Sequence, residues 1–370
     1  MLRNHWLCVH KKEIVIVFIV CFVVFACLLA IASTKRANKR TTSQKVESTF
    51  SPLTTKQPIP TVTTTPFPTE SPTKLPIITP NTSISSKIIF GIGSQAGPAM
   101  DYRLVQEAPV HMLTSWYNGT KDLEWMSVQK NDLIPRLYEH NYIVHLITWT
   151  DLPEEEIDTP HGPACGRAYP VSPQVVEDMK QLAQIYNGTG PLYVSLFTEF
   201  PSFTCIDNNW NGNENYWLTL QDNYRMIKDN FHQYAPNSKV SISWGGWLNR
   251  YDDNINQGGR SLFPYFAEVM RESDFISFQT MESDTNVNDI ANMTAILYSY
   301  GRPIMLAHYK PSNSSSEVFD SDMRQLFTDE MIHQLVQKGL FAISFMDDEM
   351  INKSETSYQL VKDGIQKYGK

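Results

Sequence analysis

The chain has 370 residues, 42% of them hydrophobic and 12% aromatic, which is enough apolar material for one large packed core. Its formal net charge is −8, but residues 1–85 hold 10 Lys and Arg against 3 Asp and Glu, which leaves 21 basic and 36 acidic residues in the rest. A domain this acidic is poorly suited to bind a polyanion, so the composition argues against a nucleic-acid partner.

The first predicted element is a helix over residues 14–33, a run of 20 residues without a charge. As a helix this run is about 30 Å long and can cross a bilayer once, whereas a core helix is rarely so apolar. A cleaved signal peptide is the main alternative, because Ala30 and Ala32 form an A-x-A site, although the run is long for a signal sequence. We predict that residues 1–34 form a cytoplasmic stub and a transmembrane anchor.

Residues 35–86 are rich in Thr, Ser, Pro and Lys, with phrases such as TVTTTPFPTESPTKLP. This composition cannot bury a core, so the segment is predicted to be a disordered linker. The positive-inside rule would place the basic residues 35–40 in the cytoplasm, but stalks of this kind usually hold a domain outside the membrane. The predicted location is therefore the cell membrane, with a single span and an extracytoplasmic C-terminal domain.

Of the five cysteines, Cys8, Cys21 and Cys27 lie in or beside the N-terminal hydrophobic run, which leaves Cys165 and Cys205. An isolated pair in an exported domain fits a disulfide, and two buried free thiols are an equal alternative. N-x-S/T sequons begin at Asn118, Asn187 and Asn292 and are compatible with export.

From residue 87 onward, short segments rich in β-branched and aromatic residues alternate with segments of helical spacing. The strand-like segments are 87–93, 110–118, 142–150, 192–200, 241–247, 275–281, 303–309 and 341–348. The helical segments are 122–140, 175–186, 216–234, 261–272, 288–300, 320–338 and 355–368. This alternation indicates parallel βαβ units, and eight of them predict a closed (β/α)8 TIM barrel over residues 87–370. An open doubly wound sheet is the alternative, but GIGSQAG at 91–97 lacks the GxGxxG spacing of its first turn.

Active sites of such barrels lie at the C-terminal ends of the strands. The most informative residue there is Glu199, a charge that ends the apolar run LYVSLFTEF. The other candidates for substrate binding at strand ends are Trp116, Trp149, Trp244, Trp247, Gln279, His308 and Tyr309. Aromatic faces beside carboxylates suit a sugar, whose C–H faces stack on rings while its hydroxyls form hydrogen bonds. We therefore expect a polysaccharide or another glycan as the partner.

The stretch LYVSLFTEFPSF, followed by NWNGNENYWLTLQDNYRMIKDNF and SISWGGW, resembles the fourth-strand region of retaining β-glycanases and most closely the family 26 mannanase-like enzymes. The resemblance implies that Glu199 is the general acid/base of a glycoside hydrolase acting on a β-mannan or β-glucan. In that clan a nucleophilic Glu ends strand seven, in a phrase like P-I-x-x-x-E. Here the phrase is PIMLAHY, with His308 in that place. A histidine cannot form the stable glycosyl ester of a carboxylate, so the usual retaining mechanism is not expected.

Three interpretations of this replacement remain open. In the first, Asp347 or Asp348 at the end of strand eight supplies the second carboxylate, and the alternation of that strand directs Asp348 into the barrel mouth. In the second, the partner is Glu282, after strand six. In the third, the barrel binds glycan without hydrolysing it, as a surface pseudoenzyme.

Two of the candidates also have simpler explanations. Glu199 could cap a helix or pair with Arg225 or Lys228, and His308 could be a hydrogen-bonded core histidine. HExxH, GxSxG and P-loop spacings are absent from the sequence. We therefore expect no metal or cofactor, and a monomeric domain.

Overall fold

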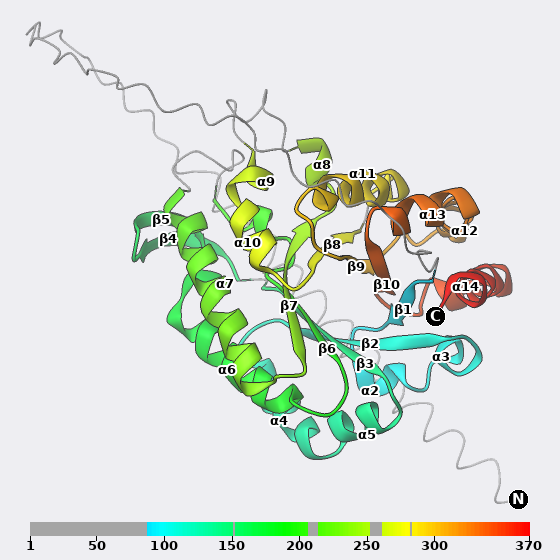
Figure 1. Ribbon diagram of the computed structural model, residues 1–370, viewed down its shortest axis with the longest axis horizontal. Helices are drawn as coiled ribbons and strands as arrows, with labels where there is room; N and C mark the ends of the chain where they lie inside the picture. Colours follow the sequence, from blue (N-terminus) through cyan, green and yellow to red (C-terminus); the bar gives the residue numbers. More distant parts are fainter. Residues whose placement is uncertain (1–86, 151, 206–213, 252–260, 282) are drawn as a thin grey trace, which may run out of the picture. The chain divides into compact units, whose positions relative to one another are not determined.

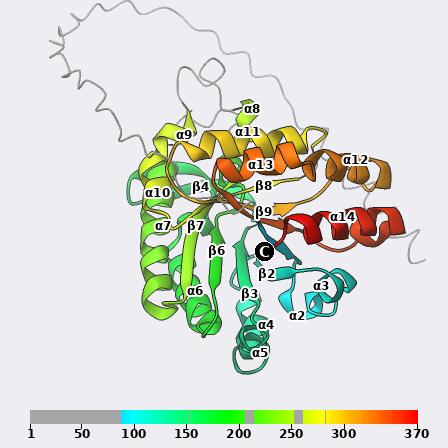
Figure 2. The same ribbon diagram turned by 45° about the vertical axis from the view of Figure 1, so that its right-hand side comes forward.

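The computed structural model describes residues 87–150, 152–205, 214–251, 261–281 and 283–370. These residues form a closed barrel of eight parallel strands in the order β1-β10-β9-β8-β7-β6-β3-β2, surrounded by helices (Figures 1 and 2). The prediction of a (β/α)8 TIM barrel is confirmed. The predicted transmembrane helix at 14–33 and the linker at 35–86 lie outside the described residues. Within the described ranges, no helix has the length and apolar character needed to cross a bilayer.

Each barrel strand overlaps one of the eight predicted segments. The strands are β1 (Ile89–Ile92), β2 (Val110–Tyr117), β3 (Ile143–Thr148), β6 (Leu192–Leu196), β7 (Ser238–Gly245), β8 (Ile276–Thr280), β9 (Ile304–Tyr309) and β10 (Leu340–Phe345). Their outward side chains pack with the helices into one large apolar core. Because both faces of a barrel strand are covered, the strands appear in the sequence as nearly continuous apolar runs.

The interior of the barrel is apolar near the N-terminal ends of the strands and polar in its middle. At the N-terminal end, Met112, Phe275 and Met305 pack together. In the layer above, Thr114 Oγ1 is 3.2 Å from His145 Nδ1, and His145 Nε2 is 2.9 Å from Ser195 Oγ. The strands therefore carry hydrogen-bonding groups into the middle of the barrel, where barrels of this type usually hold branched apolar residues.

The connections between the strands contain helices of very different lengths. The α-helices are α2 (Ala96–Ala99), α3 (Arg103–Glu107), α4 (Asp122–Ser127), α5 (Leu133–Glu139), α6 (Pro173–Tyr186), α7 (Glu214–Tyr234), α8 (Leu248–Tyr251), α9 (Leu262–Tyr265), α10 (Ala267–Glu272), α11 (Asn286–Tyr298), α12 (Ser316–Leu326), α13 (Asp329–Gln337) and α14 (Glu355–Tyr368). The short 3-10 helices are η1 (Val128–Asn131), η2 (Tyr169–Val171), η3 (Phe200–Ser202) and η4 (Ile351–Lys353).

Three predicted helices are each divided in the structure, and one of them, 261–272, forms α9 and α10. The segment 122–140 forms α4, η1 and α5, because Pro135 fits only the first turn of a helix and cannot continue one from the residues before it. The segment 320–338 forms the end of α12 and then α13. A new helix begins there because the Thr328 side chain caps it, accepting a hydrogen bond from the Met331 N–H at 3.2 Å.

An antiparallel hairpin that the sequence did not predict lies between β3 and α6. It consists of β4 (Glu154–Thr159) and β5 (Gly162–Arg167), with Ile157 opposite Ala164. A disulfide joins Cys165 of β5 to Cys205 in the loop after β6, with the two Cα atoms 5.3 Å apart. The hairpin therefore connects the C-terminal ends of β3 and β6.

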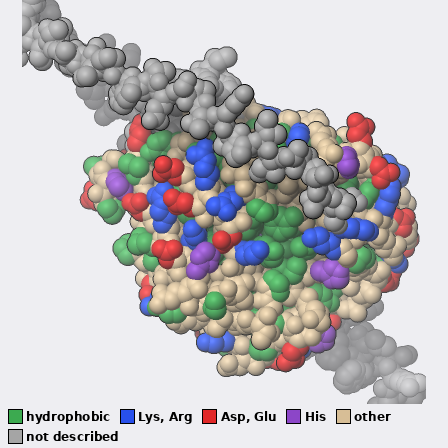
Figure 3. Space-filling model, viewed as in Figure 1, with side chains coloured by type: hydrophobic (Ala, Val, Ile, Leu, Met, Phe, Trp, Pro, Cys, Tyr) green, Lys and Arg blue, Asp and Glu red, His purple; other side chains and the backbone are tan. Residues whose placement is uncertain are grey.

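Ion pairs join neighbouring helices on the outside of the barrel. Arg103 of α3 is 2.8 Å from Glu355 of α14, and Glu107 of α3 is 2.7 Å from Lys362 of α14. On the face drawn in Figure 3, acidic and basic side chains are interspersed around an apolar patch near the centre. Exposed ion pairs contribute little to stability, so the fold depends mainly on its apolar core.

Candidate active site

Glu199 lies three residues beyond β6 with an unusual backbone conformation. Its φ is 65°, and Phe197 two residues earlier has a φ of 56°, so both adopt the left-handed region that non-glycine residues rarely enter. Each such residue costs about 1–2 kcal/mol, which contacts with its surroundings must offset. The Phe197 N–H donates to Thr148 Oγ1 and the Thr198 N–H donates to the Thr148 carbonyl, both at 2.9 Å. The end of β3 therefore fixes the backbone that presents Glu199.

The side chain of Glu199 is half-buried and is held by Gln279 at the C-terminal end of β8. The Gln279 Nε2 group donates a hydrogen bond to Glu199 Oε1. The register of β8 against β9 shifts between Phe278 and Gln279, which places Gln279 opposite His308 and leaves Ala307 as the extra residue. Such bulges are common beside active sites because they redirect a side chain. Gln279 thus orients the Glu199 carboxylate while remaining buried itself.

His308, near the C-terminal end of β9, is fully buried. Its Nε2 is 3.0 Å from the Met281 sulfur, and its ring lies 4.8 Å from the ring of Trp116. Burial, together with the nearby His145, lowers the pKa of His308 to about 3. His308 is therefore neutral near pH 7.

Several polar atoms at the strand ends have no hydrogen-bond partner within the described part of the chain, although they are buried. They include Trp116 Nε1, Thr198 Oγ1, Gln279 Oε1 and His308 Nδ1. Buried polar atoms in folded proteins are usually paired, so these four atoms can form hydrogen bonds to water or to a polar ligand at the strand ends. A molecule with many hydroxyl groups can both donate and accept there.

Asp347 and Asp348 follow β10 and are partly exposed. Asp347 Oδ1 accepts from the Glu349 N–H at 3.0 Å, and Asp348 Oδ2 accepts from Asn352 Nδ2 at 2.7 Å. Burial and the charge of Asp347 raise the pKa of Asp348, despite its own hydrogen bonds. Burial and the two carboxylates also raise the pKa of Tyr102, so the acidic pair lies near that phenol. Glu282, the other candidate carboxylate, lies outside the described residues.

Three of the four predicted tryptophan platforms are partly exposed at the strand ends: Trp116, Trp149 and Trp247. The Trp247 indole lies against Gly245, where an added Cβ atom would be only 2.6 Å from its Nε1. Glycine at the end of β7 therefore makes room for this ring. The three tryptophans come from the ends of β2, β3 and β7.

The prediction that Trp244 and Tyr309 bind substrate is wrong. Trp244 is fully buried, with its ring 4.7 Å from Phe200 and 4.8 Å from Phe263 in the layer between the barrel and the helices. Tyr309 is also buried, and its hydroxyl donates to Asp322 of α12 at 2.6 Å. Both side chains occupy outward positions of their strands, which the position near the strand end alone does not reveal.

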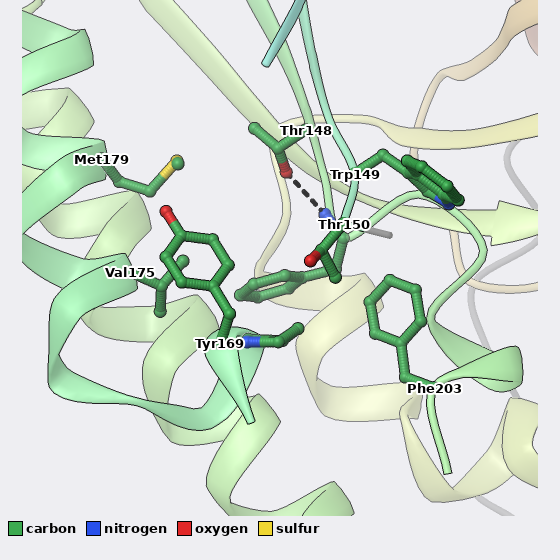
Figure 4. A pocket seen from close by; sticks show the side chains of 9 residues that line it. Thr148, Trp149, Thr150, Tyr169, Val175, Met179 and Phe203 are labelled. Carbon is green, nitrogen blue, oxygen red and sulfur yellow. Dashed lines mark hydrogen bonds between the residues drawn. The ribbon is translucent and has the colours of Figure 1, made fainter. Parts of the chain in front are cut away.

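A small apolar cavity lies behind the ends of β3 and β6, on the side of α6. In Figure 4, Tyr169, Val175 and Met179 lie on one side of it, and Trp149 and Phe203 lie on the other. Sugar sites need several convergent polar groups, so this cavity is not the candidate site.

Arg225 and Lys228, the possible ion-pair partners of Glu199, contact Glu272 on the outer helices instead. Arg225 donates to the Glu272 carboxylate, and Lys228 donates to the Glu272 backbone carbonyl. The described ranges hold no cluster of three or more His, Cys, Asp or Glu side chains of the kind that binds a metal. Arg167, whose guanidinium lies near Trp149, was not among the predicted site residues, because the hairpin that carries it was not predicted.

No protein-family profile and no curated protein sequence matches the chain. Similar solved structures include GH26A from Muricauda sp. MAR_2010_75, with 12% identity, a TM-score of 0.43, and coverage of 77% of this chain and 89% of that one. Xylanase 10B from Thermotoga maritima has 12% identity, a TM-score of 0.49, and coverage of 76% and 96%. The GH53 catalytic domain of Ignisphaera aggregans has 15% identity, a TM-score of 0.45, and coverage of 73% and 87%. These names span several glycoside-hydrolase families and do not single out family 26, and such low similarity carries no information on substrate or residue roles.

Proposed function

We propose that the protein is a membrane-tethered glycoside hydrolase that cleaves O-glycosidic bonds of an extracytoplasmic polysaccharide of the β-mannan or β-glucan type. The observation that carries this proposal is the position of Glu199: it lies just beyond the C-terminal end of the fourth barrel strand, β6, accepts a hydrogen bond from Gln279, and is close to buried polar side chains at the strand ends. The tether is inferred from the uncharged run at 14–33 and the linker at 35–86.

In the proposed reaction, Glu199 donates a proton to the glycosidic oxygen as the bond from that oxygen to the anomeric carbon breaks. The rings of Trp116, Trp149 and Trp247 stack against neighbouring sugar units. Asp348, with Asp347 as its substitute, takes a proton from the attacking water or stabilises the developing positive charge on the sugar. The raised pKa of Asp348 suits the first role, because a stronger base removes a proton more readily.

The second candidate function is glycan binding without hydrolysis. The observation that favours it is His308, which is neutral and buried in the place of the strand-seven nucleophile. A binding protein needs the tryptophans and the unpaired polar atoms but no second carboxylate. Both candidate functions therefore predict that the protein is retained by a glycan, and only the hydrolase is expected to cleave it.

The test is a screen of the full chain, in detergent, against a panel of polysaccharides for reducing-end release and for retardation in affinity gels. We expect the wild type to show both, and Glu199→Gln to keep retardation while release falls at least about a hundredfold, the usual contribution of a general acid. Glu272→Gln is the matched control, because Glu272 bonds to Arg225 on outer helices near the opposite end of the barrel.

Each outcome separates the candidates. Retardation without release by the wild type would favour glycan binding alone. Unchanged release by Glu199→Gln would remove Glu199 from the reaction, and the absence of both signals over the whole panel would refute both candidates.

A further inference from the structure

Arg167, the last residue of β5, places its guanidinium group between two aromatic rings. Its central carbon lies 5.5 Å from the ring of Trp149 and 5.0 Å from the ring of Phe203. Figure 4 shows both rings on the same side of the small cavity. A planar guanidinium stacks well on aromatic faces, whereas a lysine ammonium offers only a point charge. Arg167 therefore contacts one candidate sugar platform and the loop that follows Glu199.

The main chain of Arg167 ties the same loops together. Its N–H donates to the Phe203 carbonyl at 2.8 Å, and its carbonyl accepts from the Tyr216 hydroxyl of α7 at 2.9 Å. Its side chain also donates to the carbonyl of Thr150, after β3. One residue thus bonds to the segments that follow β3 and β6 and to the start of α7.

The residues just before Arg167 reinforce this connection. The Cys165–Cys205 disulfide lies beside it, and the Cys205 N–H donates to the Cys165 carbonyl at 3.3 Å. A Cβ atom at Gly166 would lie 2.6 Å from the Phe203 carbonyl oxygen, so the two segments approach as closely as glycine permits. We call Arg167 with this disulfide the Arg167 clamp.

The loop that the Arg167 clamp holds is the loop that carries Glu199. The Ser202 N–H and hydroxyl donate to the Glu199 carbonyl at 2.9 and 2.8 Å, and Phe203 follows directly. Because the left-handed backbone conformation of Glu199 is intrinsically unfavourable, the neighbouring segments must hold it in place. Without the clamp, this loop can relax toward ordinary backbone angles and carry the carboxylate away from Gln279.

The charge of Arg167 also lacks the usual compensation. Among the residues that the structure describes, no carboxylate forms an ion pair with it, and its buried Nε has no hydrogen-bond partner. A buried donor without a partner costs about 1–3 kcal/mol. The guanidinium of Arg167 is therefore held by ring stacking and by hydrogen bonds to backbone carbonyls.

We propose that Arg167 is a positioning residue for the Glu199 loop and the Trp149 platform, and this proposal rests on the proposed function of Glu199. Arg167 acts through the two aromatic rings and the Phe203 backbone and does not contact the substrate itself. The cysteine pair makes the same arrangement dependent on an intact disulfide.

The first test measures amide hydrogen exchange in the wild type, Arg167→Lys and Arg167→Ala, and does not depend on any enzymatic activity. We expect exchange at the Thr198, Phe203 and Cys205 amides to accelerate at least about tenfold in both variants, while the amides of β6 keep their protection. Arg302→Lys is the matched control, because Arg302 also donates to a backbone carbonyl, that of Arg271, but at the N-terminal end of β9. Wild-type protection of the loop in Arg167→Lys would overturn the proposal. If Arg167→Ala does not fold, Arg167→Lys and the Cys165→Ser/Cys205→Ser double variant decide the question in the same way.

The second test uses the polysaccharide that the wild type hydrolyses. We expect Arg167→Lys to lower kcat by about tenfold to a hundredfold, the effect of misplacing a reacting group by about 1 Å, with a change in KM of less than about threefold. A change in KM alone, or no change in either constant, would contradict a positioning role. If the wild type neither cleaves nor retains any glycan, the proposed function fails, while hydrogen exchange still decides whether the clamp holds the loop.

Discussion

His145 and His308 are both fully buried inside the barrel, in a region that most barrels fill with apolar side chains. His145 hydrogen-bonds with Thr114 and Ser195, and His308 contacts Met281 and Trp116. Burial lowers the pKa of His145 to about 3, and burial together with the nearby His145 lowers the pKa of His308 to about 3. The folded protein therefore keeps both rings neutral over a pH range in which an unfolded chain would protonate them.

This difference predicts a loss of stability in mild acid. An unfolded histidine titrates near pH 6.5, so between about pH 6.5 and pH 3 the unfolded state binds more protons and stability falls as the pH falls. Each histidine should reduce the free energy of unfolding by about 2 kcal/mol at pH 5 relative to pH 7. Urea titrations at the two pH values should show a smaller difference for His308→Gln than for the wild type. The exposed His333→Gln variant should behave like the wild type, and an identical pH dependence for His308→Gln would refute the explanation.

Some residues of the candidate site can be predicted from the sequence and others cannot, for physical reasons. Glu199 is recognisable because a charge at the end of an apolar strand is unusual. Trp244 and Tyr309 were misassigned because a position near a strand end does not reveal which way the side chain points. For Tyr309 the direction also follows a register shift between β8 and β9 that leaves no mark in the sequence. Arg167 could not be found because its neighbours come from the segments after β3 and β6 and from α7, which are distant from it in the sequence.

A buried carboxylate fixes helix α6 to the barrel. Its buried Asp178 accepts hydrogen bonds from the hydroxyls of Tyr117, Tyr169 and Thr120 at 2.6–2.8 Å and from the Gln174 amide at 2.7 Å. Burial raises the pKa of Asp178, but these hydrogen bonds outweigh it and the net pKa is lowered. One carboxylate thus fastens α6 to the C-terminal end of β2.

Replacing this carboxylate should loosen α6. We expect Asp178→Ala to lower the free energy of unfolding by about 3 kcal/mol, because it leaves several buried donors without an acceptor. Asp178→Asn should cost less, since its amide oxygen still accepts. Urea denaturation measures both, with the exposed Asp158→Ala as the control. A loss below about 1 kcal/mol in Asp178→Ala would show that the carboxylate does not hold the helix.

Elements were predictable where their pattern is repeated and buried. All eight barrel strands follow from apolar runs bounded by helical segments, since a parallel strand must hide both faces. The hairpin of β4 and β5 was missed because EEEIDT has low strand propensity, and its pairing depends on β5 and on the Cys165–Cys205 disulfide. Contacts between segments distant in sequence decide such elements.

The composition of residues 1–86 predicts that the whole molecule is anchored in a membrane. We expect the full chain to remain with membranes after carbonate extraction, because an uncharged span of 20 residues inserts stably. A chain consisting of residues 87–370 should appear in the supernatant. Recovery of the full chain in the supernatant, or a mass showing cleavage near Ala32, would replace the anchor with a signal peptide.

The proposed hydrolase function depends on whether Glu199 donates the proton to the leaving group. The most direct measurement compares Glu199→Gln with the wild type on two substrates: the polysaccharide identified by the screen, and an aryl glycoside of the same sugar whose acidic phenol leaves without protonation. We predict that the rate on the polysaccharide falls at least about a hundredfold and the rate on the aryl glycoside less than about tenfold. An equal loss on both substrates would contradict the assignment of Glu199 as the general acid.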